Sequence, residues 1–154
     1  SEGQEREGRM IANRTTSISC EKTVAEIQSM LAGVRASAMM LDYDSDGKPC
    51  GLAFRLERDG QSMAFRLPCN WQGVLNALKK ERGGIPQRLL TADHAKRVSW
   101  RILKDWLRAQ LSLIEAGASS IEEVMLPWAI TTDGQTVAQR LLSGTTNLLR
   151  LNEG

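Results

Sequence analysis

The sequence predicts an α+β fold: a three- to four-stranded antiparallel meander packed against helices, with one long central amphipathic helix. Three observations predict it. A tight-turn dipeptide, Asp59-Gly60, separates two runs in which apolar residues alternate with polar ones. A long segment with helical periodicity runs from Ala92 to Ala116. Apolar residues make up 42% of the chain and charged residues 25%, as in a folded globular domain.

The chain has 154 residues, which is the usual size of one domain. We expect a polar N-terminal tail over 1–9, a single α+β domain over 10–146 and a C-terminal tail over 147–154. The amino end lacks the hydrophobic segment of a signal peptide. No apolar run approaches the roughly 20 residues that cross a bilayer. These features predict a cytoplasmic protein without a membrane partner.

The cysteines Cys20, Cys50 and Cys69 are odd in number and form no CxxC pair. With one histidine in the chain, neither a disulfide framework nor a zinc site is expected. We therefore expect three reduced thiols and no cofactor.

The first elements are a strand and a helix. Residues 14–19 are rich in β-branched side chains and predict a short edge strand. Thr23 and Glu26 have capping-box spacing, so a helix is expected to begin at Thr23 and to end at Gly33. The apolar positions of this helix form one stripe: Val24, Ile27, Met30 and Leu31.

Three strands are expected next, over 37–43, 51–58 and 61–67, with a turn over 44–49. A two-residue loop at Asp59-Gly60 fixes the register of the second and third strands. Three cross-strand pairs then share the core face: Leu52 with Leu67, Phe54 with Phe65, and Leu56 with Met63. The same register places Arg55 and Arg66 as diagonal neighbours on the opposite face.

Helices fill the rest of the chain. Asn70 and Thr91 are expected to cap helices over 71–82 and 92–116, because their side chains can accept from free backbone amides. A short helix is expected to begin near Ser119 and to stop at Pro127. A last helix is expected over 136–142.

The long helix carries a basic stripe. Four of its cations fall within about 60° of one another around the helix axis: Arg97, Arg101, Lys104 and Arg108. Trp100 borders them. Guanidinium groups bind phosphate in a bidentate manner, and an indole can stack on a base. The stripe predicts a site for a phosphate-bearing ligand, to which Arg55 and Arg66 contribute if the outer sheet face meets the helix. The alternative is a solvated helix face with Trp100 in the core.

Charge is unevenly spread. The segment 79–108 has nine basic and three acidic residues, whereas 115–154 has five acidic residues and two arginines. A basic middle and an acidic end predict an anionic partner or a head-to-tail contact between subunits. We therefore expect a homo-oligomer.

Other reactive residues are interpreted as structural. His94 lies near a helix start without a visible catalytic partner, and we expect it to be a surface or capping residue. Asp42, Asp44 and Asp46 resemble half of a calcium loop, but Ala53 stands where that loop needs a bidentate Glu, so they are interpreted as turn residues. The sequence contains none of the common catalytic motifs.

Three stretches, 65–81, 94–117 and 122–128, resemble uncharacterised small α+β proteins of phages and other mobile elements. The resemblance implies a genomic setting and no catalytic residue. In that setting, small non-enzymatic proteins commonly bind nucleic acid, bind a host defence protein, or sequester a nucleotide immune signal. The hypothesis from the sequence is a non-enzymatic binding protein for an anionic nucleotide or nucleic acid. The alternative is a protein-interaction module that inhibits or scaffolds a host protein.

Overall fold

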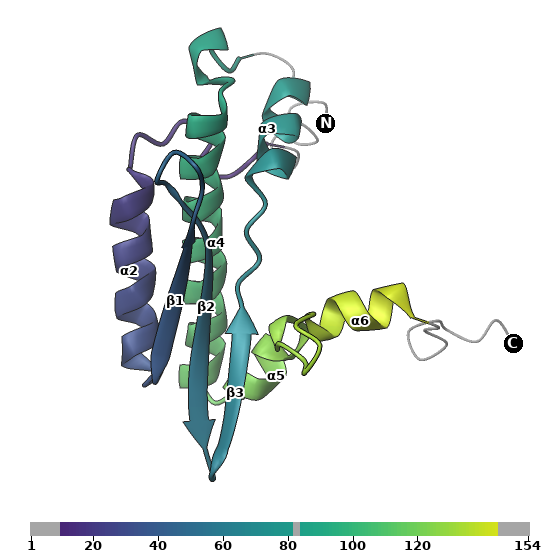
Figure 1. The fold of residues 1–154 in the computed structure, drawn as a ribbon. Coiled ribbons are helices and arrows are strands. Elements are labelled where there is room, and N and C mark those ends of the chain that lie inside the picture. Colours follow the sequence, from purple (N-terminus) through teal and green to yellow (C-terminus); the bar gives the residue numbers. More distant parts are fainter. Residues whose placement is uncertain (1–9, 82–83, 145–154) are drawn as a thin grey trace, which may run out of the picture.

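A three-stranded antiparallel sheet with helices on one face forms the centre of the molecule (Figure 1). The computed structural model describes residues 10–81 and 84–144, so the predicted tails 1–9 and 147–154 lie outside it. The predicted α+β class is confirmed. In chain order the elements are α2 (Cys20–Gly33), β1 (Ala38–Tyr43), β2 (Pro49–Arg58), β3 (Gln61–Arg66), α3 (Trp71–Lys80), the 3-10 turn η1 (Gln87–Leu89), α4 (Ala92–Glu115), α5 (Ile121–Met125), the 3-10 turn η2 (Leu126–Trp128) and α6 (Val137–Ser143).

The predicted hairpin register is confirmed. In the β2–β3 ladder, Phe54 lies opposite Phe65 and Leu56 opposite Met63. The two phenylalanine rings stack, with their centroids 5.3 Å apart. Asp59 and Gly60 have φ angles of 52° and 75°, as a two-residue turn between twisted strands requires. The strand order is β1-β2-β3.

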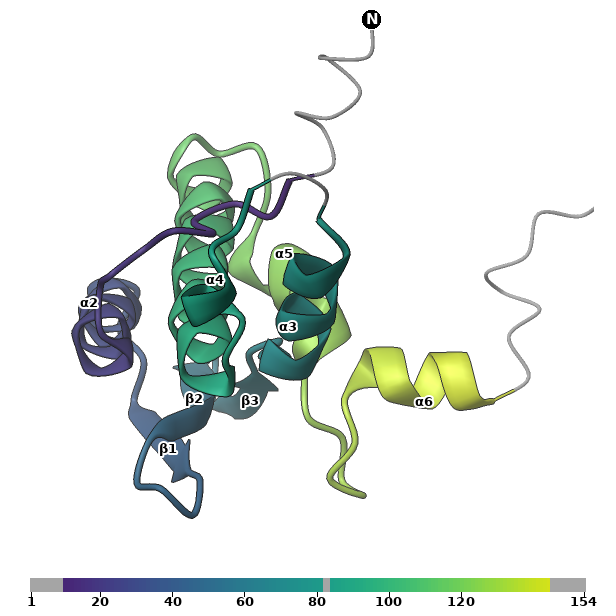
Figure 2. The ribbon, with the colours of Figure 1, turned by 90° about the horizontal axis from the view of Figure 1, so that it is seen from above.

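The core lies between one face of the sheet and the helices α2, α4 and α5 (Figure 2). Each element contributes the apolar side of its pattern to a single cluster. Its most deeply buried members are Ile27, Leu31, Leu52, Leu56, Phe65, Trp100, Leu107 and Met125. The opposite face of the sheet carries exposed side chains such as Arg55 and Met40.

The predicted edge strand over 14–19 is wrong. This segment forms a turn and an irregular stretch, and it crosses over α4 instead of joining the sheet. The Nδ2 group of Asn13 donates to Asp105 at 2.8 Å, and Arg14 pairs with Glu81 at 2.9 Å. β-branched residues favour strands only where a sheet edge receives them. Here the helices α3 and α4 supply the polar partners.

One predicted helix start is wrong and another is confirmed. Helix α2 begins at Cys20 rather than Thr23, because the Ser19 hydroxyl accepts from the amide of Lys22 at 3.1 Å. The predicted cap of α4 is confirmed: the Thr91 hydroxyl accepts from the amide of His94.

The last helix, α6, points away from the sheet in both views (Figures 1 and 2). Before it, Ala129 bridges to Phe65, and the Ile130 amide donates to the Ala64 carbonyl at 2.8 Å, so this segment covers the free edge of β3. Leu142 on α6 remains 75% exposed. Among the described helices, none is sufficiently long and apolar to traverse a bilayer.

Candidate functional site

The basic stripe of α4 is divided into parts with different partners. In its middle, Arg101 donates to Oε2 of Glu26 on α2 at 2.8 Å, and Lys104 donates to the same oxygen. The hydrogen bond from Lys104, with a further contribution from Arg101, lowers the pKa of the Glu26 carboxyl. Because both cations share one carboxylate between two packed helices, this part of the stripe fastens α2 to α4.

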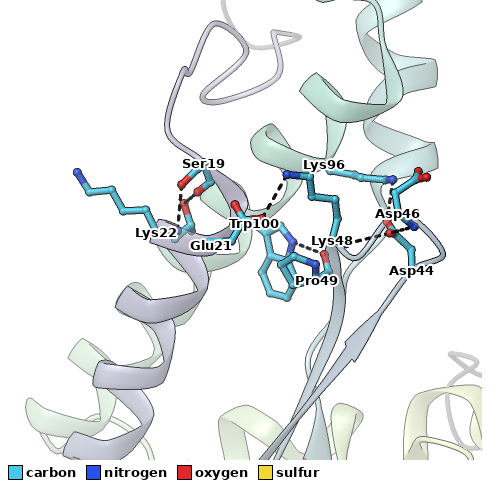
Figure 3. A network of polar contacts seen from close by, with 10 residues as sticks. Ser19, Glu21, Lys22, Asp44, Asp46, Lys48, Pro49, Lys96 and Trp100 are labelled. Atoms are coloured by element: carbon cyan, nitrogen blue, oxygen red, sulfur yellow. Dashed lines mark hydrogen bonds and ion pairs between the residues drawn. The ribbon is translucent and has the colours of Figure 1, made fainter.

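Trp100 is not available for base stacking, contrary to the ligand-binding role predicted for it. Only 1% of the residue is exposed. Its indole N–H donates to the carbonyl oxygen of Pro49 at 3.0 Å, as Figure 3 shows. The alternative reading of Trp100 as a core residue is the one that agrees with the structure.

Arg55 and Arg66 do not join the stripe, because the sheet separates them from α4. Both lie on the outer face, as predicted, but α4 packs on the other face. Arg55 contacts Ser37 and Glu57, at 3.3 and 3.7 Å. Arg66 donates to the carbonyl of Gly134 at 3.2 Å. Both side chains therefore hold local structure at the sheet surface.

The amino-terminal end of the stripe opens into a pocket of about 480 Å³. Arg97 on α4 and Arg88 on η1 both line it. The segment 14–19, which crosses α4 and is called the crossing segment below, supplies Thr15, Thr16, Ser17 and Ser19. Pro86 and Leu89 come from the chain just before α4, and His94 comes from α4 itself. Arg108, at the other end of the stripe, is exposed and takes no part in this lining.

His94 is a buried residue of the pocket lining that contacts two other segments. The sequence predicted a surface or capping residue, but only 1% of His94 is exposed. Its Nε2 lies 2.6 Å from the carbonyl oxygen of Arg14, and its Nδ1 lies 3.5 Å from Nη2 of Arg97. A carbonyl only accepts and a guanidinium only donates. With a proton on Nε2, the ring donates to the Arg14 carbonyl, and Nδ1 can accept from Arg97.

The positive charge of Arg97 extends to the start of α2. Ser19, which caps that helix, lines the pocket, and Cys20 follows it. Burial raises the pKa of the Cys20 thiol, the Glu21 carboxylate adds to this, and the charge of Arg97 opposes it. The carboxylate of Glu21 therefore affects this thiol more than the charge of Arg97 does.

A separate contact fixes the first turns of α4. Lys96 pairs with Asp44 at 2.8 Å (Figure 3). Its ammonium group also lies 5.0 Å from the ring centroid of Trp71. The hydrogen bond between Lys96 and Asp44 lowers the pKa of Asp44 and raises that of Lys96. The other Asp44 oxygen accepts from the amides of Asp46 and Lys48 at 2.9 and 3.0 Å. Asp44 is therefore a turn residue, as predicted, and Lys96 is occupied.

Two features of the pocket were missed by the sequence analysis. Arg88 lies in a loop without periodicity, so no sequence pattern connects it with Arg97. The segment 15–19 lies far from α4 in sequence, and only the fold brings it there. Across residues 10–81 and 84–144, no group of three or more His, Cys, Asp or Glu side chains is arranged to hold a metal ion.

Comparison with protein-family models, with curated proteins and with solved structures gives no match for this chain.

Proposed function

We propose that the protein binds an anionic nucleotide in the pocket formed by Arg88, Arg97 and His94, without turning it over. The observation that carries the proposal is that two arginines from separate elements, Arg88 and Arg97, line one pocket. Guanidinium groups are suited to phosphate because their paired N–H donors match two phosphate oxygens. A pocket of this volume falls within the range of small-ligand sites.

The absence of turnover is supported by the state of His94. Both of its ring nitrogens have protein partners, namely the Arg14 carbonyl and Arg97. A general base needs a free acceptor within reach of the substrate proton. Binding alone would suffice to sequester a nucleotide signal, which is one of the roles common in the phage setting that the resemblance implies.

A thermal-shift and calorimetry screen tests this proposal, using adenosine monophosphate, other nucleotides and a short oligonucleotide. A nucleotide that binds the native state raises Tm by mass action. We expect this rise to disappear in the double variant Arg88→Glu/Arg97→Glu and to persist in Arg108→Glu, which reverses a charge outside the pocket. A rise that survives in the double variant would reject this site. Nucleic acid as the main ligand would instead show affinity that falls steeply with salt.

We propose self-association as a second role, because α6 and β1 carry exposed apolar side chains. Leu141 and Leu142 of α6 are 38% and 75% exposed, and Met40 of β1 is 58% exposed. These surfaces also suit the alternative of a module that binds a host protein. Light scattering distinguishes the two. A dimer that becomes monomeric in Leu141→Ser/Leu142→Ser supports self-association, whereas a monomer at all concentrations argues against it.

A further inference from the structure

The pocket lining combines positive charge with an absence of carboxylates and of Phe, Tyr and Trp side chains among the residues that the structure describes. Within that part of the chain, the lining holds two arginines and no acidic residue. The remaining side chains are a histidine, four hydroxyl residues and the apolar Pro86 and Leu89. The wall is thus complementary to more than one negative charge, and it has no aromatic platform for a nucleobase.

We infer that the group bound inside the pocket is a terminal phosphoryl dianion, that is, a phosphomonoester; this deepens the proposed function and depends on it. A phosphomonoester carries a charge of about −1.5 to −2 at pH 7, whereas an internal phosphodiester carries one negative charge. Two guanidinium groups without a competing carboxylate match the dianion. Three terminal oxygens also offer more acceptors to Arg88 and Arg97 than the two free oxygens of a diester.

The composition of the lining indicates that the sugar and the base of the ligand lie at the mouth of the pocket. Base recognition usually depends on stacking against aromatic rings. The described lining contains no Phe, Tyr or Trp, and its one histidine is only 1% exposed. Thr15 and Ser17 are exposed at this wall, and their hydroxyls can bond a ribose or another polyol. The pocket therefore selects the phosphoryl group and is tolerant of the base.

His94 acts here as a positioning residue. Its Nδ1 accepts from Arg97, and its Nε2 proton is held by the Arg14 carbonyl. The guanidinium of Arg97 is thereby restrained at the wall before any ligand arrives, which reduces the entropy lost on binding.

Calorimetry with four probes tests the inference: adenosine 5′-monophosphate, uridine 5′-monophosphate, ribose 5-phosphate and adenosine 3′,5′-cyclic monophosphate. We expect the three monoesters to bind with similar affinity, and the cyclic diester to bind at least about tenfold more weakly. Arg88→Gln and Arg97→Gln should each weaken monoester binding by about tenfold or more. Arg108→Gln is the matched control on the same helix and should bind as the wild type does.

The outcomes separate the inference from the proposed function. Equal binding of the cyclic diester and the monoesters overturns the phosphomonoester inference and leaves nucleotide binding intact. Strong preference for one base overturns the placement of the base outside the pocket. No binding of any probe overturns the proposed function as well.

The variant Arg97→Lys controls for misfolding, because it keeps the positive charge and loses the paired donors. Weaker monoester binding at unchanged Tm supports the inference. Unchanged binding overturns the role of the guanidinium.

Discussion

The middle and the amino-terminal end of one helical stripe have different environments in this protein. In the middle, Arg101 and Lys104 converge on Glu26 of α2 and are mostly buried. At the amino-terminal end, Arg97 lines a pocket and contacts His94. The sequence presents all three as the same pattern. What distinguishes them is the segment that lies opposite: an acidic helix face in one case and a hydroxyl-rich crossing segment in the other. A basic stripe therefore predicts a ligand only where the fold provides no carboxylate.

The largest effect is expected from removing the buried indole of Trp100, which the sequence analysis had assigned to the stripe. Trp100→Ala should lower the free energy of unfolding by about 3–5 kcal/mol, because a large buried side chain leaves a cavity and the Pro49 carbonyl loses its donor. Chemical denaturation measures this loss. Trp106→Ala, at a half-buried position on the same helix, should cost less. A similar loss in both variants would contradict the central position given to Trp100.

Binding should respond next, and only at one end of the stripe. Arg97→Gln should reduce affinity for adenosine monophosphate by about 10- to 100-fold, since hydrogen bonds to charged groups contribute about 1.5–3 kcal/mol each. Arg101→Gln should leave that affinity within about threefold of the wild type, because its partner is Glu26. Calorimetry on folded variants decides between them. If Arg101→Gln weakens binding as much as Arg97→Gln, the division of the stripe is wrong.

Thermal stability should respond in the middle of the stripe, at the contact with Glu26. In Glu26→Gln, Arg101 and Lys104 lose their shared carboxylate while remaining mostly buried, so Tm should fall and ligand affinity should not. The Glu26 pKa is lower in the folded chain than its ordinary value of 4.5. As the pH falls below about 4.5, the unfolded chain takes up this proton first, and the contribution to stability is lost. In a plot of Tm against pH, the fall in Tm on the acid side should therefore be less steep in Glu26→Gln than in the wild type. A fall identical to that of the wild type would show that Glu26 does not contribute.

The smallest effect is expected at Arg108. Its side chain is exposed and lies outside both the pocket and the contact with Glu26. Arg108→Gln should change the free energy of unfolding by no more than about 0.5 kcal/mol, as surface substitutions usually do. Denaturation and calorimetry both serve as checks. A clear loss of affinity would extend the site along the whole stripe.

The sequence predicted local features well. The β2–β3 register follows from two turn residues and the alternation beside them, so it needs no knowledge of the rest of the chain. The caps at Asn70 and Thr91 likewise involve amides only a few positions away. The start of α2 was predicted wrongly even though it is local, because Ser19 competes with Thr23 as the cap and the structure uses Ser19.

The site was predicted only in part, because its geometry comes from distant segments. Arg97 was among the predicted residues, but Glu26 lies 75 positions before Arg101, and no pattern in the helix reveals that pairing. His94 was expected at the surface, but it is buried. The segment that covers it contacts it through Arg14, 80 positions earlier, and the sequence near His94 gives no sign of this contact. Strand propensity over 14–19 was misleading for the same reason: the context, rather than the β-branched residues, decided its conformation.

The crossing segment also has a consequence for hydrogen exchange. None of the residues 10–19 is buried, and polar contacts with His94, Asp105 and Glu81 are prominent among those that hold the segment. Segments without core contacts open locally at a small fraction of the free energy of global unfolding. Backbone amides here should therefore exchange with solvent much faster than those of α4. One wall of the pocket can thus separate and close again while the core stays intact, and a bound ligand would order the part of the molecule that is otherwise quickest to open.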